Sequence, residues 1–325
     1  MTMRVLVLGA DGFIGQHLVG SLAGSGFARP IAAGRRAAAA ASTAAIPRLT
    51  FDATAEESLV TALRDVDAVV NCIAGSPANI ASSARALFAA AQRQSRPPLV
   101  VHLSSMAVYG AVSGVVPETA ALLGNDPYAQ AKIAAESLCR QYQPVVIFRP
   151  GIVYGPRSWQ WTERIARWLL AGRLGDLGPA GDGVCNLVYV DDVVTAVSQA
   201  LRLPAAHGQC FNLAMAEPPT WNQYLIDFAR ALAAVPVKRI GRRRLQIETK
   251  LLAPPLKIAE ILCSKARIRS THLPEAIPPS LLRLFQQDMR LDVAQAEQSL
   301  QLHWTALADG LQQSVRWFQR QTQDA

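Results

Sequence analysis

The stretch Arg4-Val5-Leu6-Val7-Leu8-Gly9-Ala10-Asp11-Gly12-Phe13-Ile14-Gly15 decides the fold of this chain. Its apolar start has the length of a buried strand, and apolar residues at helical spacing follow up to Ala23. The first glycine permits a tight turn, the second lets backbone approach a pyrophosphate, and the third lets the helix pack on the strand. The helix N-terminus adds N–H groups, so the stretch predicts a dinucleotide site with Gly9, Gly12, Phe13, Ile14 and Gly15 at the cofactor. A glycine-rich turn without a ligand is the alternative.

The same alternation of strands and helices continues along the chain. Further strands are predicted at 30–34, 48–51, 68–72, 99–103 and 145–148, and helices at 55–64, 78–92 and 127–141. The Ala-rich run 37–45 is expected to be a loose surface connection. Strands that alternate with helices form βαβ units, so we expect an α/β protein with a Rossmann-type, doubly wound and mostly parallel sheet.

The pattern changes after Gly151. Glycines are dense from 172 to 183, which indicates a loop, and from Thr220 onward the chain is mainly helical in tendency. A strand at 187–190, a helix at 191–201 and a strand at 209–213 resume the earlier alternation. We therefore expect a dinucleotide-binding Rossmann domain from 1–155 with 186–215 returning to it, and a smaller, mainly helical, C-terminal substrate lobe from 156–185 and 216–325.

The net charge of +8 lies in one late segment. Residues 238–270 hold ten Lys or Arg and two acidic residues, so the remainder of the chain is neutral. We therefore expect no nucleic-acid face on the Rossmann domain. The segment is expected to be a solvated surface, with weak contact to a membrane surface as the alternative. No window has the roughly 18 apolar residues of a transmembrane segment.

The cysteines bear on the cellular compartment and on metal binding. There are five of them, Cys72, Cys139, Cys185, Cys210 and Cys263, and no two form a C-x-x-C pair. An odd, scattered set indicates neither a disulfide framework nor a metal site. The first residues also lack the pattern of a signal peptide. We expect a cytoplasmic protein, and the chain is compatible with a homodimer.

Two arginines bear on the choice of cofactor. An NAD-preferring site places an acid on the ribose hydroxyls about 20 residues beyond the glycines, and this chain has Arg35 and Arg36 there. Guanidinium groups match a 2'-phosphate in charge and in their forked geometry. The sequence therefore predicts a preference for NADP, with NAD and a simple solvated turn as the alternatives.

Tyr128 and Lys132 lie four residues apart, hence on one face of the helix that starts near Pro127. We expect the ammonium to favour the phenolate and to lower the tyrosine pKa from about 10 toward the working pH, as proton transfer requires. On spacing alone, an ordinary surface pair is the alternative. Ser105 follows the strand at 99–103, where its hydroxyl can bind a substrate oxygen, whereas His102 is expected to be an ordinary strand residue.

Five motifs in order carry a family resemblance. They are residues 9–15 (GADGFIG), 102–110 (HLSSMAVYG), 128–132 (YAQAK), 149–156 (RPGIVYGP) and 188–193 (VYVDDV). Together they resemble the extended short-chain dehydrogenase/reductase superfamily, specifically its NAD(P)-dependent sugar epimerase/dehydratase family. The resemblance implies that Tyr128 is the catalytic acid or base, that Lys132 binds the nicotinamide ribose and tunes Tyr128, and that Ser105 is their hydroxyl partner. It also implies an adenine contact at Asp52 and a cofactor-ribose contact at Ala74; Asp52 as a helix cap is the alternative.

The residues after Ser105 bear on the reaction. Dehydratase-like and decarboxylase-like members carry acids there, because elimination needs a further acid or base, whereas this chain has Met106 and Ala107. The sequence therefore favours an epimerase or reductase that acts on a nucleotide-sugar by hydride transfer, with Tyr128 as proton donor or acceptor.

Two departures from the family pattern keep other functions open. Ile152 stands where many members carry an asparagine near the substrate diphosphate, and Cys185 stands where an arginine is frequent. They motivate a second hypothesis, an NADP-dependent reductase or dehydrogenase of a lipid, steroid-like or polyphenol ketone. A third is a non-catalytic dinucleotide-binding scaffold protein, against which the intact Ser105, Tyr128 and Lys132 argue.

Overall fold

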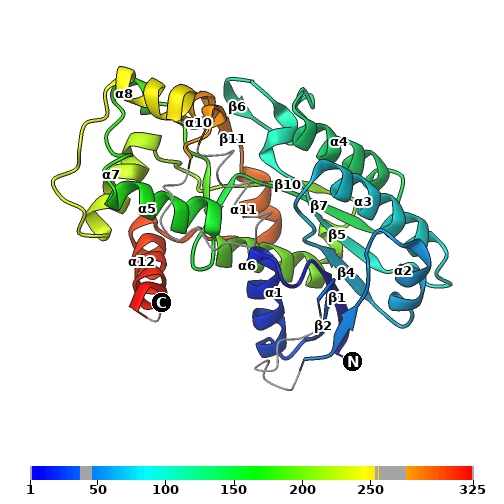
Figure 1. Cartoon of the computed structure of the whole chain (residues 1–325). Coiled ribbons are helices and arrows are strands. Elements are labelled where there is room, and N and C mark those ends of the chain that lie inside the picture. The colour runs from blue at the N-terminus through cyan, green and yellow to red at the C-terminus, as the bar shows by residue number, and fades with distance from the viewer. Residues whose placement is uncertain (1, 37–45, 253–254, 256–275, 324–325) are drawn as a thin grey trace. The chain divides into compact units, whose positions relative to one another are not determined.

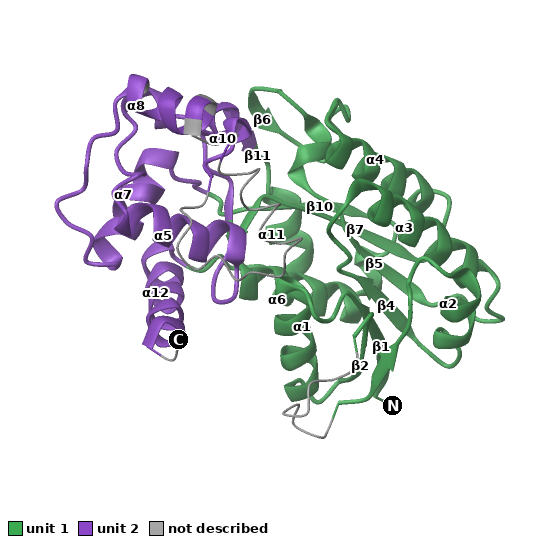
Figure 2. Cartoon of the chain, viewed as in Figure 1, with its two compact units in different colours: residues 1–153, 188–216, 291–305 green, residues 154–187, 217–290, 306–325 purple. Residues whose placement is uncertain are grey.

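The computed structural model describes residues 2–36, 46–252, 255 and 276–323 (Figure 1). The Ala-rich run 37–45 and much of the basic segment, 253–254 and 256–270, lie outside the described residues. The chain forms two compact units (Figure 2). Unit 1 comprises residues 1–153, 188–216 and 291–305, and unit 2 comprises residues 154–187, 217–290 and 306–325.

Unit 1 is built on a seven-stranded sheet with the order β10-β7-β5-β4-β1-β2-β3, and the neighbouring strands pair in parallel. The strands are β1 (Met3–Leu8), β2 (Ala28–Gly34), β3 (Arg48–Thr50), β4 (Ala68–Asn71), β5 (Leu99–Leu103), β7 (Val145–Pro150) and β10 (Cys210–Leu213). The order reverses between β1 and β4, where Leu8 aligns with Asn71. The expected doubly wound Rossmann sheet is thus confirmed, and its ligand crevice lies beyond the carboxyl ends of these strands.

Helices cover both faces of the sheet, as Figure 1 shows. On one face lie α2 (Glu56–Ala62), α3 (Pro77–Gln92) and α4 (Pro127–Cys139), which pack side by side. The other face carries α1 (Phe13–Gly24) and α6 (Val190–Arg202), with α11 (Ala294–Leu300) packed on α6 and β10. All of these helices except α11 lie in the connections between parallel strands, as a doubly wound sheet requires.

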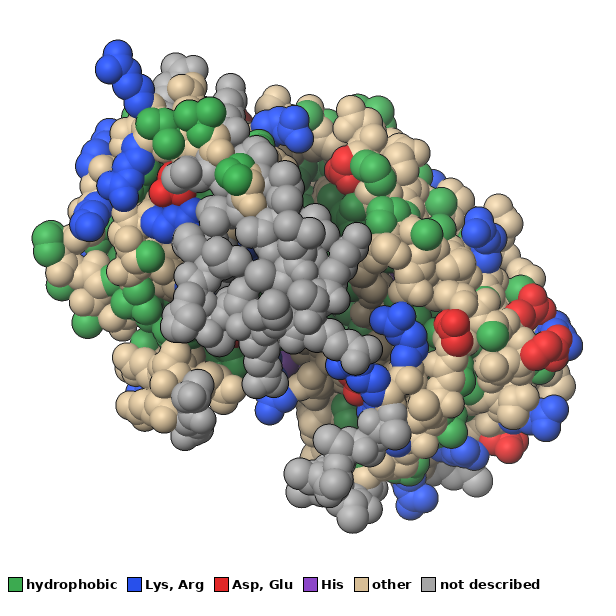
Figure 3. Space-filling model, viewed as in Figure 1, with side chains coloured by type: hydrophobic (Ala, Val, Ile, Leu, Met, Phe, Trp, Pro, Cys, Tyr) green, Lys and Arg blue, Asp and Glu red, His purple; other side chains and the backbone are tan. Residues whose placement is uncertain are grey.

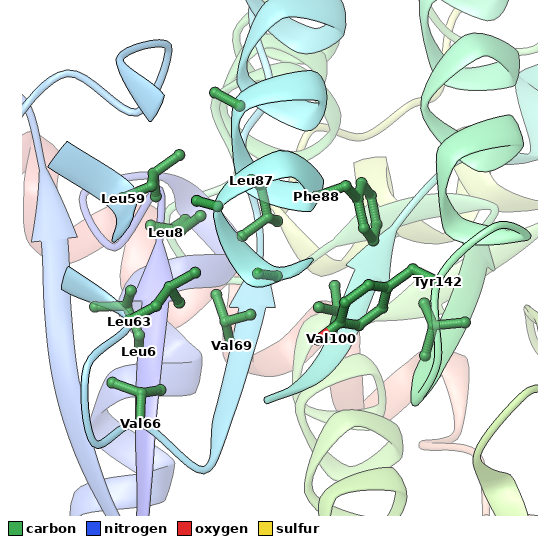
Figure 4. Close-up of a cluster of buried hydrophobic side chains, with 14 of the residues drawn as sticks. Leu6, Leu8, Leu59, Leu63, Val66, Val69, Leu87, Phe88, Val100 and Tyr142 are labelled. Carbon is green, nitrogen blue, oxygen red and sulfur yellow. The ribbon is translucent and has the colours of Figure 1, made fainter. Parts of the chain in front are cut away.

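The core under α2 and α3 is a cluster of buried side chains (Figure 4). Leu6, Val69 and Val100 reach it from neighbouring strands, and Leu59 and Leu87 reach it from the two helices. All five side chains are fully shielded from solvent. Burial of one such aliphatic side chain stabilises a fold by about 1.5–3 kcal/mol, so the cluster holds α2 and α3 on the sheet.

Three short strands were not expected from the sequence. They are β6 (Gly114–Val116), β8 (Ile152–Tyr154) and β11 (Met289–Leu291), and β9 (Leu187–Tyr189) is equally short. Shortness alone is not the reason, because the equally short β3 and β9 were expected; β6, β8 and β11 pair in two-stranded sheets outside the seven-stranded one, which no local pattern indicates. The glycine-rich stretch 172–183 is a loop, as expected, apart from a 3-10 turn at Gly178–Gly181.

Unit 2 is mainly helical. A π-helical turn (Trp159–Glu163) leads into α5 (Arg164–Leu170), followed by α7 (Trp221–Ala231), α8 (Arg242–Gln246), which continues as a π-helical stretch (Ile247–Leu252), α10 (Pro279–Phe285) and α12 (Leu307–Gln323). Aromatic side chains form its core, where the rings of Trp221 and Phe285 lie 4.8 Å apart. Arg243 and Arg244 of α8 are exposed, and Figure 3 shows basic side chains over this part of unit 2. No helix in the described part of the chain has the length and apolar character to cross a bilayer.

Candidate functional site

The glycine loop after β1 has the geometry of a phosphate cradle. Gly9 has a φ of +76°, and a β-carbon there would lie 3.0 Å from the Cys72 carbonyl oxygen. A β-carbon on Gly15 would collide with the Gly9 carbonyl oxygen, so helix α1 packs on the turn only because this residue is glycine. Gly12 starts α1, whose first turn has no side-chain cap and no acidic residue. These features suit the close approach of an anionic pyrophosphate.

A pocket of about 440 Å³ opens beside this loop in unit 1. Eight of the predicted cofactor residues line it: Gly9, Gly12, Phe13, Ile14, Arg35, Arg36, Asp52 and Ala74. Lining residues that the sequence did not single out are Leu8, Asp11, Ala33, Gly34, Phe51, Ala53, Cys72, Ile73 and Asn79. The structure thus brings residues from the ends of β1, β2 and β4 to one wall, and this wall fits the adenosine half of a dinucleotide.

Asp52 lines this pocket and also stabilises the turn before α2. Its Oδ1 accepts hydrogen bonds from the Thr54 backbone N–H and from Thr54 Oγ1, both at 2.9 Å. The backbone hydrogen bond is the main cause that lowers the pKa of this carboxyl group. Asp52 is therefore an ionised side chain that shapes the turn before α2 while it faces the pocket.

Ser105 and Tyr128 come together beyond the carboxyl end of β5. Asp126 caps α4 by accepting hydrogen bonds from the backbone N–H groups of Tyr128 and Ala129, at 2.9 and 3.0 Å. This cap places Tyr128 in the first turn of the helix. Ser105 starts a 3-10 turn, where its hydroxyl accepts a hydrogen bond from the Ala107 backbone N–H at 3.2 Å, and it lies near enough to the Tyr128 side chain to lower the pKa of that phenol. The two side chains predicted to act together are thus brought near one another.

Burial raises the pKa of Tyr128. The nearby Ser105 hydroxyl lowers this pKa and nearby Asp126 raises it, but burial is the larger effect. The expected lowering by Lys132 is wrong for this structure. Lys132 Nζ lies 5.9 Å from the centre of the Tyr128 ring and donates a hydrogen bond to the Leu103 carbonyl oxygen at 2.7 Å. Tyr128 is therefore a protonated phenol at neutral pH.

Lys132 is almost fully buried beneath the Tyr128 turn. Desolvation lowers its pKa from 10.5 to about 8, although Cys72, Cys139 and Glu136 raise it. An ammonium with this pKa is still charged at neutral pH and loses its charge in mild alkali. It is thus a buried cation near the tyrosine, held in place by the Leu103 carbonyl oxygen of β5.

A buried polar network that the sequence did not single out lies next to this site. Arg149 donates hydrogen bonds to both carboxylate oxygens of Glu136, at 3.0 and 2.6 Å, and to the Tyr109 hydroxyl at 2.8 Å. Ser104, beside Ser105, donates to the same Glu136 carboxylate at 2.5 Å. The signal for Glu136 was its spacing, because it stands four residues after Lys132 on an otherwise alanine-rich helix face. Arg149 stood within a quoted motif, but no role was assigned to it.

His102 does not act as a proton-transfer group in this arrangement. Its Nδ1 lies 3.2 Å from Asn71 Nδ2, and Nε2 has no hydrogen-bond partner in the described part of the chain. Desolvation lowers its pKa from 6.5 to about 3, and the Lys132 charge adds to this effect. A neutral imidazole inside the sheet agrees with the ordinary strand residue expected from the sequence.

Ile152 and Cys185, the two departures from the family pattern, are both buried. Neither side chain presents a hydrogen-bonding group comparable to the asparagine or arginine found in many members. Among the described residues, no group of three or more His, Cys, Asp or Glu is arranged to hold a metal ion.

The family comparison gives a clear match. Residues 5–214 match the model of the NAD dependent epimerase/dehydratase family. A curated relative, an uncharacterized UDP-glucose epimerase YtcB of Bacillus subtilis (strain 168), is 32% identical over 126 residues. This alignment covers 36% of the present chain and only 39% of the relative.

Solved structures show the same fold over nearly the whole chain. The UDP-glucuronic acid 4-epimerase of Bacillus cereus, in complex with UDP-glucuronic acid and NAD, gives a TM-score of 0.74 at 20% identity and covers 98% of this chain and 100% of that one. The UDP-glucose 4-epimerase of Thermotoga maritima gives 0.72 at 20% identity, with coverage of 98% and 100%. A dTDP-glucose 4,6-dehydratase of Bacillus anthracis, in complex with NAD, gives 0.74 at 17% identity, with coverage of 99% and 98%.

Proposed function

We propose that this chain, which belongs to the NAD dependent epimerase/dehydratase family, is an NAD(P)-dependent epimerase or reductase that acts on a nucleotide-sugar. The observation that carries the proposal is the position of Ser105 near the Tyr128 side chain beyond β5. Because β5, β4 and β1 are parallel neighbours, this pair shares the carboxyl edge of the sheet with the glycine loop. Proteins of the same fold include epimerases that were solved with UDP-sugars, which supports the substrate class.

The proposed chemistry divides between the cofactor and the side chains. A bound nicotinamide dinucleotide supplies hydride transfer. Tyr128 gives a proton to a substrate carbonyl oxygen, or takes one from an alcohol in the reverse direction. Ser105 orients that oxygen by a hydrogen bond, and the Lys132 ammonium binds the nicotinamide ribose. The raised pKa of Tyr128 favours the donor direction in the structure as it stands.

We also propose that NADP is the preferred cofactor, with NAD as the alternative. Exposed Arg35 and Arg36 follow β2 and line the pocket, where an NAD-preferring site would carry an acid. Guanidinium groups at that place favour a ribose phosphate. NAD occupies several related structures, so a direct comparison of NADPH and NADH binding decides this part of the proposal.

A second candidate function rests on Ile152 and Cys185. Their buried apolar and thiol side chains stand where polar groups would assist a diphosphate, so the substrate could be a lipid, steroid-like or polyphenol ketone. In that case the same Tyr128 would give its proton to a ketone oxygen, and the reaction would consume NADPH.

The rest of the proposal concerns the setting of the enzyme. We propose that unit 2 contributes substrate-binding residues and that the protein works in the cytoplasm. We also propose that two copies of the chain form a homodimer. The scattered cysteines support a reducing compartment, since none of them forms a paired motif. Size-exclusion chromatography with light scattering would show whether the chain is a dimer in solution.

Turnover by the Tyr128→Phe variant tests the proposal. We expect the loss of the phenol proton to lower kcat by about a thousandfold, while dinucleotide binding stays within a factor of about two. The assay offers a panel of nucleotide-sugars and ketones and follows both product formation and nicotinamide absorbance. Turnover without a net absorbance change identifies an epimerase, and a net change identifies a reductase.

Tyr142→Phe is the matched control, because Tyr142 donates its hydroxyl proton to the Pro98 carbonyl oxygen, away from the pocket. We expect this variant to keep wild-type kcat. Full activity of Tyr128→Phe on every substrate, or no dinucleotide binding by the wild-type chain, would overturn the proposed function.

A further inference from the structure

A carboxylate from another part of the chain lies against the end of β2. Gly34 closes this strand, and the next two residues are arginines. A β-carbon on Gly34 would collide with Asp11 Oδ2 and would lie 2.9 Å from Arg48 Nη2. The side chains of Asp11, from the glycine loop, and Arg48, from β3, therefore cover the backbone where an NAD site would present its ribose-binding acid.

Arg48 is held in one orientation by two acceptors. Its Nη2 donates to Asp11 Oδ1 at 2.8 Å and to Asp11 Oδ2 at 2.7 Å. Nε and Nη2 also donate to the Arg36 carbonyl oxygen, at 3.1 and 2.7 Å. Nη1 donates to no residue that the structure describes, and Arg48 itself is not among the residues that line the pocket. Both residues that hold Arg48 line the pocket.

The charges around this point favour a phosphate. Arg35, Arg36 and Arg48 carry three positive charges, against the carboxylates of Asp11 and Asp52. The Arg48 side chain is 19% exposed, so its charge is partly shielded from water and acts more strongly than that of a free surface arginine. Without Arg48, the carboxylate of Asp11 would face the incoming phosphate and repel it.

We infer that the Asp11–Arg48 pair determines the specificity of the adenosine ribose subsite: Arg48 donates hydrogen bonds to a 2'-phosphate, and Asp11 holds the guanidinium in position. The inference rests on the proposed function, because it presupposes that the pocket binds a nicotinamide dinucleotide. In the opposite assignment, the Asp11 carboxylate accepts a hydrogen bond from the 2'-hydroxyl of NAD, and Arg48 only holds Asp11 in position.

Binding of two small fragments tests the pair separately from catalysis. Adenosine 2',5'-bisphosphate and adenosine 5'-monophosphate are titrated into the full chain by calorimetry. We expect the wild type to bind the bisphosphate about tenfold more tightly, and Arg48→Gln to reduce this preference to about twofold or less without weakening the monophosphate. Arg48→Lys, which keeps the charge but not the fork, should be intermediate.

Two further variants separate a direct role of Arg48 from other effects. Arg29→Gln removes an exposed arginine of β2 that does not line this pocket, and it should leave the preference unchanged. In the double variant Asp11→Asn with Arg48→Gln, the repelling carboxylate is gone as well. We expect the preference to stay lost, because the donor itself is missing.

The outcomes separate the inference from the function on which it rests. If Arg48→Gln keeps the full preference, or if the double variant restores it, Arg48 is no phosphate donor and the inference fails. If the wild type prefers the monophosphate, the result supports the opposite assignment, and the inference about Arg48 fails. If the wild type binds neither fragment and no dinucleotide, the proposed function itself fails.

Discussion

Unit 1 contains two arginine–carboxylate pairs that differ in their surroundings. The side chains of Arg149 and Glu136 are 2% and 0% exposed, whereas those of Arg48 and Asp11 are 19% and 46% exposed. The inner pair also binds Tyr109 and Ser104, and the outer pair binds only the Arg36 carbonyl oxygen besides itself among the described residues. Similar chemistry therefore serves two purposes: the inner pair holds the site residues in place, and the outer pair stands at the solvent edge, where it can meet a ligand.

The inner pair should show the largest effect when one partner is removed. Glu136→Gln leaves the Arg149 guanidinium buried without its counter-charge, which destabilises a protein by about 3–5 kcal/mol. We expect that loss in the free energy of unfolding measured in urea. The double variant Glu136→Gln with Arg149→Met should recover much of the stability, since no unpaired charge remains. A single variant as stable as the wild type would show that the network does not hold the fold.

His102 differs from both arginine–carboxylate pairs, because it is a buried titratable group without a charged partner. Its pKa is about 3 in the fold and about 6.5 in the unfolded chain, so between these values only the unfolded chain takes up a proton. The stability that neutral His102 contributes is therefore present above about pH 6.5 and is lost as the pH falls. From about pH 7 to about pH 5 we expect a loss of about 2 kcal/mol in the free energy of unfolding.

The control for His102 is the His102→Asn variant, which has no imidazole to protonate. Its free energy of unfolding should fall less over the same pH interval, as measured by urea unfolding at both pH values. An equal fall in the variant and the wild type would mean that other groups cause the acid sensitivity.

The outer pair should show the smallest effect on stability. Asp11→Asn removes an ion pair at the solvent edge, where such pairs contribute about 0.2–1 kcal/mol, and salt should reduce even that difference. We expect the melting temperature of the variant to change by a few degrees at most. A loss as large as that of Glu136→Gln would remove the distinction between the two pairs.

Local patterns in the sequence were sufficient for most of unit 1. The strands at 99–103 and 209–213 and the helix at 78–92 were predicted to within one residue of β5, β10 and α3. Such elements are recognised because their burial periodicity repeats over several residues and because caps and prolines mark their ends. Strands β6, β8 and β11 escaped prediction, because they pair in two-stranded sheets outside the seven-stranded one and that pairing depends on distant partners.

The candidate site also has features that local sequence patterns predict and features that they do not. The glycine loop and Tyr128 with Lys132 follow local spacing rules, and the structure places the loop at a pocket and Tyr128 against Ser105. The protonation state of Tyr128 does not follow such a rule. Its pKa depends on burial and on where the Lys132 ammonium points, and both are properties of the packed fold.

The sequence by itself determined the alternation of strands and helices, the glycine turn and the residue types available at each strand end. These are consequences of steric rules and periodicity within a few residues. Only the tertiary structure decided which charges meet. It brought Arg48 onto the Asp11 of the opening glycine stretch, 37 residues earlier in the chain, and it buried Arg149 against Glu136. Such pairings depend on parallel strands and packed helices that bring together side chains which no local pattern connects.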